Sequence, residues 1–324
     1  MQRWKGLEQV PEGWGPSVVT VGVFDGVHRG HQHTVGRAAQ RGVELGLPVA
    51  AVTFDPNPVE VVRPGLHPLI LTAIDRRVQL LGDAGADAVL VQQFTEELSK
   101  QAPEQFVVDF LVRGLHAAAV VVGRNFRYGH RAAGDLTMLE RLGSEHGFSV
   151  EGLDLVVQHT GPVSSTYIRD LIQSGDVTGA ARALGRPHRV EGVVVVGDKR
   201  GRELGFPTAN LDVAPYTAVP ADGIYAGWLL AAGGVPGAAS GGPQRLPAAI
   251  SIGTNPTFDG IERRVEAYAL DRTDLELYGE HVAVDFAERL RETLKFDSAG
   301  ALVEQMHVDV RRARALVGSG GAGS

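Results

Sequence analysis

Cysteine is absent from this chain of 324 residues. Disulfide bonds, thiolate metal sites and cysteine nucleophiles are therefore all excluded. Long hydrophobic runs are absent as well: no segment approaches about 18 uninterrupted apolar residues, so we expect no membrane span. The first residues, MQRWKGLEQVPEGWG, contain no apolar run of the kind that forms a signal peptide. These absences lead us to expect a cytoplasmic protein.

Positive charge is in deficit, since 31 lysines and arginines stand against 38 acidic residues and give a formal net charge of −7. Proteins that bind nucleic acid usually carry a basic surface that replaces phosphate counterions. The balance therefore argues against a nucleic-acid partner. It does not exclude a small anionic ligand, because a local cluster of N–H groups, arginine and metal is enough to bind one.

The length of the chain favours two domains, because single hydrophobic cores stop growing at about 250–300 residues. In the first half, short and nearly all-apolar runs alternate with stretches of helical spacing. Such runs are typical of strands buried on both faces of a parallel sheet. The runs occupy residues 17–24, 48–54, 87–94 and 117–123, and the helical stretches include residues 75–84 and 103–115. This alternation predicts a doubly wound α/β sheet.

The pattern changes after residues 180–185. Short strands separated by Gly/Pro turns, with little helix between them, favour a small antiparallel β-barrel. These strands are expected at residues 189–198, 223–232, 246–254 and 264–271, and an amphipathic helix at residues 298–316. We therefore predict an α/β domain over residues 1–184, a barrel domain over residues 187–316 and a flexible tail over residues 317–324.

The strongest local motif is the segment Gly22–His31, which follows a buried strand directly and precedes a helix. In open α/β sheets, ligands bind at such carboxyl ends of strands, and the N–H groups of a helix N-terminus favour anions. Gly26 and Gly30 allow a phosphate to approach the backbone closely. His28 and His31 can then donate hydrogen bonds to phosphate oxygens as charge develops at phosphorus.

Two other interpretations of these histidines stay open from the residues alone. In most isolated HxxH sequences, both histidines are ordinary surface or capping residues. A metal site formed by His28, His31 and His33 is less favoured, because no carboxylate lies among them and a helix would direct His33 away from the other two.

The same segment resembles the HxGH signature of the nucleotidylyltransferase superfamily, and more narrowly the FAD synthetase module of bacterial riboflavin kinase/FAD synthetases. Residues 53–58, 123–129 and 164–169 resemble further motifs of that module, in the expected order. The resemblance implies adenylyl transfer, in which the phosphate of FMN attacks the α-phosphorus of ATP and pyrophosphate leaves. It assigns transition-state stabilisation to His28, His31 and Arg169. It assigns nucleotide binding to Gly22, Phe24, Asp25, Gly26, Gly30, Ser164, Ser165 and Thr166, and flavin binding to Asp55, Pro56, Asn57, Pro58, Asn125 and Phe126.

A second motif, Gly201–Asn210, resembles the riboflavin kinase signature that ends in PTAN. This resemblance implies that Thr208 and Asn210 hold Mg²⁺ bound to ATP, and hard oxygen donors suit that ion. It implies that Glu266 is the base that takes the proton of the riboflavin 5′-hydroxyl, on the strand face opposite its apolar neighbours. It also assigns nucleotide binding to Gly197, Gly201, Arg202, Gly205, Phe206 and Pro207, and flavin binding to Arg291. From the residues alone, Arg291 equally fits a solvated basic helix face.

Taken together, the two motifs predict a bifunctional enzyme that converts riboflavin to FMN and FMN to FAD, with ATP and Mg²⁺. One alternative is an FMN adenylyltransferase with an inactive kinase domain, against which the presence of Thr208, Asn210 and Glu266 argues. Another is a non-catalytic flavin- or nucleotide-binding regulator, which would tolerate the loss of His28 or His31. The expected partners are small molecules, with no nucleic acid and no membrane. The sequence does not decide between a monomer and a homo-oligomer.

Overall fold

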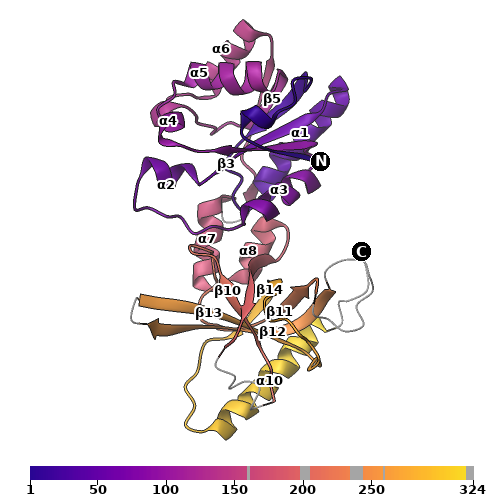
Figure 1. Ribbon diagram of the computed structural model, residues 1–324, viewed down its shortest axis with the longest axis vertical. Helices are drawn as coiled ribbons and strands as arrows, with labels where there is room; N and C mark the ends of the chain where they lie inside the picture. Colours follow the sequence, from indigo (N-terminus) through magenta and orange to yellow (C-terminus); the bar gives the residue numbers. More distant parts are fainter. Residues whose placement is uncertain (159–160, 198–204, 234–243, 258–259, 319–324) are drawn as a thin grey trace. The chain divides into compact units, whose positions relative to one another are not determined.

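The structure, a computed structural model, describes residues 1–158, 161–197, 205–233, 244–257 and 260–318. The chain divides into two compact units, Met1–Ser165 and Thr166–Ser324 (Figure 1). Each unit has its own hydrophobic core. Within the described ranges, no helix is both long enough and apolar enough to cross a membrane.

A six-stranded parallel sheet forms the centre of the first unit, in the order β1-β4-β3-β2-β5-β6. Its strands are β1 (Gln2–Lys5), β2 (Ser17–Val21), β3 (Val49–Asp55), β4 (Ala88–Gln93), β5 (Ala117–Gly123) and β6 (Ser149–Leu153). The chain runs from β2 through β3 to β4 on one side, and β5 then pairs with the other side of β2. The strand order therefore reverses between β2 and β5, which is the position where open α/β sheets bind ligands.

Helices cover both faces of this sheet. They are η1 (Leu7–Gln9), α1 (Arg29–Leu45), α2 (Pro58–Val62), α3 (Ile74–Asp83), α4 (Glu96–Ser99), α5 (Pro103–Phe106), η2 (Val107–Gly114), η3 (His130–Ala132) and α6 (Leu136–His146), followed by the short strands β7 (Val157–Gln158) and β8 (Gly161–Pro162). One apolar cluster joins the sheet to α5, η2 and α6 through Phe106, Phe110 and Leu139. Another joins it to α1 and α3 through Val35 and Leu81. The predicted doubly wound sheet is confirmed.

A closed antiparallel barrel in the order β10-β13-β12-β11-β14-β9 forms most of the second unit. Its elements, preceded by α7 (Ser165–Ser174) and α8 (Val177–Leu184), are β9 (His188–Val195), β10 (Ala209–Val213), β11 (Gly223–Ala231), β12 (Gln244–Thr257), β13 (Gly260–Ala269), β14 (His281–Arg291) and α10 (Ala299–Val317). Alternate residues of these strands fill the interior, among them Tyr225, Ile250 and Phe286. The predicted barrel is confirmed.

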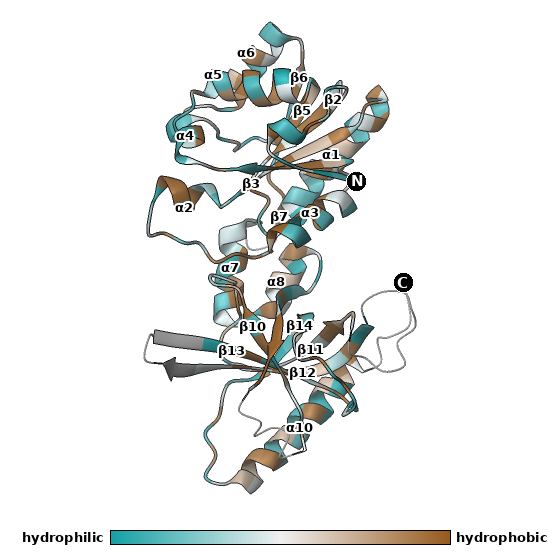
Figure 2. Ribbon diagram, in the orientation of Figure 1, coloured by the Kyte–Doolittle hydropathy of each residue, from teal (hydrophilic) through white to brown (hydrophobic). Residues whose placement is uncertain are grey.

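Helix α10 packs across the outside of the barrel. Ser298 is its N-cap, and the hydroxyl of Ser298 accepts the backbone N–H of Ala301 at 3.2 Å. Ala313 and Val317 are buried against Leu290 of β14. Figure 2 shows apolar and polar residues alternating along α10, as expected for a helix with one face on a barrel. The predicted helix at residues 298–316 is confirmed to within one residue.

Several features of the fold differ from the sequence prediction, among them β6, which matches no predicted strand. The stretch at residues 103–115 continues from α5 into a π-helix, η2, instead of one α-helix. Strand β1 pairs with β4 at the sheet edge and was not predicted, because its residues QRWK do not form an apolar run. Strand β14 was not predicted either. It pairs with β11 and β9, so Arg289 and Arg291 lie on a strand and not on a basic helix face.

Candidate active sites

The loop between β2 and α1 carries both histidines of the first motif. His28 is the N-cap of α1, and its Nδ1 accepts the backbone N–H of His31 at 3.4 Å. Phe24 and Val27, which precede it, have positive φ angles of 52° and 37°. Residues with a Cβ seldom adopt this backbone region. Such a loop persists only where its surroundings fix it, and loops of this kind cluster at functional sites.

The imidazole rings of His28 and His31 are stacked, with centroids 3.6 Å apart and planes inclined by 19°. Gly30 leaves room for them, because a Cβ there would lie 3.1 Å from the His28 ring. Burial, followed by the charges of His28 and Arg77, lowers the pKa of His31 well below its usual 6.5. His31 is therefore neutral near pH 7. Since Nδ1 of His28 accepts a hydrogen bond, a neutral His28 carries its proton on Nε2, where it can donate.

The lowered pKa of His31 makes the stability of the first unit depend on pH. Below about pH 6.5 the unfolded chain binds a proton at His31, whereas the folded unit binds it only at lower pH. The free energy of unfolding therefore carries no penalty from His31 above about pH 6.5. Below that pH it falls as the pH is lowered, by at most about 1.4 kcal/mol per pH unit, because the unfolded chain gains a proton that the folded unit does not. We expect unfolding curves of a Trp228→Phe background, in which Trp4 and Trp14 are the remaining tryptophans, to show this loss and His31→Gln to remove it. The same pH dependence in His31→Gln would contradict the prediction.

Asp25 points into the protein and fastens the nucleotide loop, Gly22–His28, to the chain before α3. Its carboxylate, only 2% exposed as a residue, accepts the backbone N–H groups of Leu71 and Thr72 at 3.1 Å each. It also lies 3.7 Å from the guanidinium of Arg77. Charge-assisted bonds of this kind are strong when they are buried. The structure therefore gives Asp25 a role inside the fold that the sequence did not indicate.

The motif at residues 164–169 reaches the nucleotide loop through one hydroxyl. The Oγ of Ser165 donates to the backbone carbonyl of Asp25 at 2.9 Å, although 140 positions separate the two residues. Ser164 is exposed beside it. Thr166 and Arg169 lie on α7 and belong to the second unit.

Both predicted flavin segments follow strands of the sheet at the same carboxyl edge. Asp55 ends β3, and Asn57 is the N-cap of α2, where its side chain accepts the N–H of Val59 at 3.1 Å. Asn125 follows β5 and is exposed, while Phe126 stacks on Tyr128 with ring centroids 5.3 Å apart. The order β3-β2-β5 places the nucleotide loop between these two segments.

Helix α2, next to the first flavin segment, carries apolar side chains that are not covered within the unit. Val59 is 41% exposed, Val62 56% and Leu66, just beyond the helix, 53%. Figure 2 shows α2 as one of the most apolar short helices of the chain. Water hydrates such an exposed apolar surface unfavourably. A flat aromatic ligand could cover it, beside Pro56 and Pro58, whose rings restrict the backbone.

In the barrel, Asn210 and Glu266 are direct neighbours. They form a Cα pair between β10 and β13, and Ser251 of β12 pairs with Glu266 from the other side. Directly opposite residues have Cβ atoms about 4.5–5.5 Å apart. Their flanking residues, including Val265 and Ala267, are buried in the barrel core. Glu266 and Asn210 therefore share the outer face of the barrel, as strand alternation predicts for Glu266.

Several residues before β10 have little space or an unusual backbone. A Cβ on Gly197 would overlap the amide of Asn210, so a larger residue there would displace that side chain. Gly205 has a φ of +86°, which also favours glycine. Phe206 is 5% exposed, with its ring edge-on to Tyr268 at 5.3 Å and to His307 at 5.1 Å. Gly201 and Arg202, which are predicted nucleotide contacts, lie outside the described residues.

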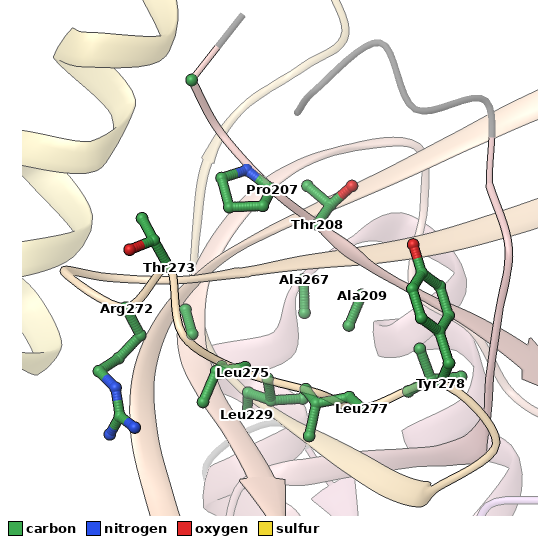
Figure 3. A pocket seen from close by; sticks show the side chains of 13 residues that line it. Pro207, Thr208, Ala209, Leu229, Ala267, Arg272, Thr273, Leu275, Leu277 and Tyr278 are labelled. Carbon is green, nitrogen blue, oxygen red and sulfur yellow. The ribbon is translucent and has the colours of Figure 1, made fainter. Parts of the chain in front are cut away.

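A pocket with a volume of about 330 Å³ opens beside the PTAN segment. Figure 3 shows Pro207 and Thr208 on one side of it and Leu275 and Leu277 on the other. Its full lining is Val194, Gly205, Pro207, Thr208, Ala209, Leu229, Ala267, Ala269, Arg272, Thr273, Leu275, Leu277 and Tyr278. Sequence reasoning missed the wall formed by residues 272–278. The signal that could have found it is an alternating Leu-x-Leu-Tyr stretch directly after a predicted strand.

The predicted flavin contact Arg291 makes its hydrogen bonds within the fold. Its Nη2 donates to Asp309 of α10 at 2.7 Å and its Nε at 3.0 Å, while Nη1 donates to the carbonyl of Glu292 at 2.9 Å. Gln305 donates to the same carboxylate at 3.0 Å. Arg291 therefore fixes α10 to the barrel, and its contact with flavin stays a prediction.

Carboxylates and histidines do not form a metal site by themselves in the described part of the chain. No group of three or more of these side chains is placed to hold an ion there. The candidate metal ligands are instead the hydroxyl of Thr208 and the amide of Asn210, whose Oγ1 and Nδ2 lie 3.5 Å apart. Two neutral oxygen donors leave most of the coordination sphere to other ligands.

Two family models match the chain: FAD synthetase at residues 10–167 and riboflavin kinase at residues 184–317. The chain is 37% identical to a bifunctional riboflavin kinase/FMN adenylyltransferase from Pseudomonas fluorescens, over 98% of each chain. It is 33% identical to the protein of that description from Escherichia coli K12, over 96% of each chain. A solved structure from Streptococcus pneumoniae, described as a macrolide-efflux protein, matches with a TM-score of 0.86 and 29% identity, over 97% of this chain and 99% of that one.

Proposed function

The chain belongs to the family of bifunctional riboflavin kinase/FMN adenylyltransferases, and from this membership we propose how its residues divide the two reactions. It phosphorylates riboflavin to FMN and adenylates FMN to FAD, with ATP as the donor in both steps. Matches to both family models carry this conclusion, because an enzyme with one module would match one model. An idle kinase module and a non-catalytic regulator are not favoured.

We assign adenylyl transfer to residues 1–184 and phosphoryl transfer to residues 187–316. Val317, the first residue of the predicted tail at residues 317–324, is buried in α10, and residues 319–324 lie outside the described part of the chain. The assignment is supported by the change from parallel sheet to antiparallel barrel after α8, which ends at Leu184. A cytoplasmic location and the absence of a nucleic-acid partner are also proposals, and the net charge of −7 supports the second.

In adenylyl transfer, the phosphates of ATP bind at the nucleotide loop against the N-terminus of α1. An oxygen of the FMN phosphate attacks the α-phosphorus, a P–O bond forms, and the bond to pyrophosphate breaks. The Nε2–H of His28 and the neutral imidazole of His31 donate to phosphate oxygens as negative charge develops. Ser165 supports the loop through the carbonyl of Asp25, and Arg169 adds a positive charge to the phosphates.

The flavin of this step is proposed to bind between the two segments that flank the nucleotide loop. Asn125 supplies a polar contact, and Asp55–Pro58 with the exposed apolar residues of α2 supplies a surface for the ring system. The sheet order supports this placement, since both segments follow strands next to β2 at one edge. The FMN phosphate would then point towards the nucleotide loop.

In phosphoryl transfer, Glu266 takes the proton of the riboflavin 5′-hydroxyl while the hydroxyl oxygen attacks the γ-phosphorus of ATP. A P–O bond to riboflavin forms, and the bond from the γ-phosphorus to ADP breaks. We propose that the pocket beside the PTAN segment holds the nucleoside of ATP. Its apolar wall suits a purine, and Thr208 at its side suits the adjoining phosphates. Asn210 is the cross-strand neighbour of Glu266, and its amide lies 3.5 Å from the hydroxyl of Thr208 in the pocket lining, so it connects the two groups.

Magnesium fits Thr208, which directly precedes β10, and Asn210 on β10, because a hydroxyl and an amide each have a hard oxygen and the two side chains approach within 3.5 Å. Gly197 leaves room for the amide. The residues that would hold it are Thr208 and Asn210, together with phosphate oxygens of ATP. When bound, the ion neutralises negative charge on the phosphates. Among the described residues, no denser set of acidic ligands competes for it.

The apolar wall of the pocket predicts how nucleotide affinity responds to truncation. Leu275→Ala removes apolar contact with the base, so we expect the KM for ATP in riboflavin phosphorylation to rise about threefold to tenfold. The KM for ATP in FMN adenylation should not change. Leu316→Ala, an exposed position on α10, is the matched control and should change neither. Equal KM values in Leu275→Ala and the wild type would place the nucleoside elsewhere.

The assay that tests the proposed division follows flavins by chromatography after riboflavin, ATP and Mg²⁺ are mixed with the purified protein. FMN should appear first and FAD later. Unchanged riboflavin, together with conversion of added FMN to FAD, would show that the kinase half is idle.

A further inference from the structure

Arg77 of α3 is a buried cation that neither the sequence motifs nor the mechanism uses. It is 5% exposed, and burying a guanidinium costs free energy unless it is fully paired. Its partners come from three separate segments of the first unit. A residue placed at such cost, directly under a proposed active site, is a candidate for a role in that site.

The hydrogen bonds of Arg77 connect the segments that hold the two substrates. Its Nη1 donates to the carbonyl of Val23 in the nucleotide loop at 3.2 Å and to the carbonyl of Phe54 at 3.1 Å. Phe54 directly precedes the flavin segment Asp55–Pro58. One nitrogen therefore joins the two segments at the carboxyl ends of neighbouring strands, β2 and β3.

A second set of contacts ties this junction to the chain before α3. The Nη2 of Arg77 donates to the carbonyl of Thr72 at 3.4 Å and lies 3.7 Å from Asp25, whose carboxylate accepts the N–H of Thr72. Thr53 closes the network, since its hydroxyl donates to the carbonyl of Val23 at 2.8 Å. A guanidinium, which is planar and carries several N–H donors, can bond to acceptors on several sides at once, whereas a lysine ammonium cannot match this geometry.

We propose that Arg77 is a positioning residue for adenylyl transfer, which fixes the distance between the nucleotide loop and the flavin segment. The inference rests on the proposed site for that reaction at the edge of β2, β3 and β5. Its physical basis is that in-line attack requires the two phosphates at a set separation, and misplacement by about 1 Å can cost on the order of 100-fold in rate. The charge of Arg77 also acts on His31, where it helps to lower the pKa.

Arg77→Lys tests the inference, because it keeps the charge beside Asp25 but removes the fork. We expect KM to rise about tenfold for both FMN and ATP in the adenylation reaction, with a fall in kcat/KM on the order of 100-fold. Thr53→Val, which removes the second link to Val23, should act in the same direction and less strongly. Riboflavin phosphorylation by the same preparations should be unchanged.

Arg76→Lys, the neighbouring arginine, which bonds Gln79 on the same helix, is the matched control. In a Trp228→Phe background, the fluorescence of Trp4 and Trp14 reports whether the first unit is folded. If Arg77→Lys lowers kcat only in proportion to the folded fraction, with both KM values unchanged, Arg77 is merely structural and the inference fails. Wild-type kinetics would also overturn it. Adenylation that survives His28→Ala would instead overturn the proposed site.

Discussion

His28→Ala is expected to lower the rate of FAD formation from FMN by about 100- to 1,000-fold, while the same protein still makes FMN from riboflavin. The loss follows from the donor that His28 places at the start of α1. Its Nδ1 accepts the N–H of His31, so a neutral ring presents Nε2–H to the phosphates. Stacking with His31 at 3.6 Å leaves the ring little freedom to turn, so this donor is in place before the reaction begins.

A second variant distinguishes the loss of the imidazole N–H donor from the loss of the helix cap, both of which His28→Ala causes. Asparagine is among the best N-cap residues, so His28→Asn keeps a side-chain acceptor for the N–H of His31. His28→Ala loses that cap as well, at a cost of about 1 kcal/mol in stability. If both variants lose adenylation equally while only His28→Ala melts earlier, the imidazole itself acts in the reaction. FAD formation at the wild-type rate in His28→Asn would contradict the assigned role.

The sheet and the barrel could be predicted because burial shapes their sequences directly. Strands β2, β3, β4 and β5 lie inside the sheet and have nearly continuous apolar runs. Strand β1 lies at the edge, where only Trp4 is buried, so its pattern carries little signal. Strand β14 mixes apolar residues with Asp285, which is buried because Arg189 pairs with it at 2.7 Å. A polar residue buried by a partner 96 positions away cannot be recognised from local periodicity.

The same distinction separates the candidate site residues that local sequence can indicate from those that it cannot. His28, Thr208 and Glu266 occur in short motifs, so local sequence selects them as candidates. Arg77 occurs in no motif, and its role depends on four backbone and side-chain partners from two strand ends and a loop. The contact of Ser165 with the carbonyl of Asp25 likewise exists only after folding. Tertiary networks of this kind are invisible to spacing rules.

Glu266→Gln is expected to lower riboflavin phosphorylation by about 100- to 10,000-fold, with conversion of added FMN to FAD unchanged. Glutamine keeps the size of the side chain and can still accept a hydrogen bond, but it cannot take the hydroxyl proton. Glu266 lies between Asn210 and Ser251 in the cross-strand register. In the proposed site, a base at this position lies next to the phosphate that the riboflavin hydroxyl would attack beside Asn210.

The size of the rate loss in Glu266→Gln shows whether Glu266 removes the proton of the hydroxyl or only orients the hydroxyl. Phosphoryl transfer depends mainly on positioning and charge neutralisation, so Asn210→Ala should lower the rate about as strongly as Glu266→Gln. Glu288→Gln, an exposed carboxylate on β14, is the matched control and should have no effect. If Asn210→Ala abolishes phosphorylation while Glu266→Gln keeps more than about a tenth of the rate, Glu266 orients the hydroxyl without removing its proton. The proton then leaves to solvent or phosphate, and the base assignment is wrong even though the site is correct.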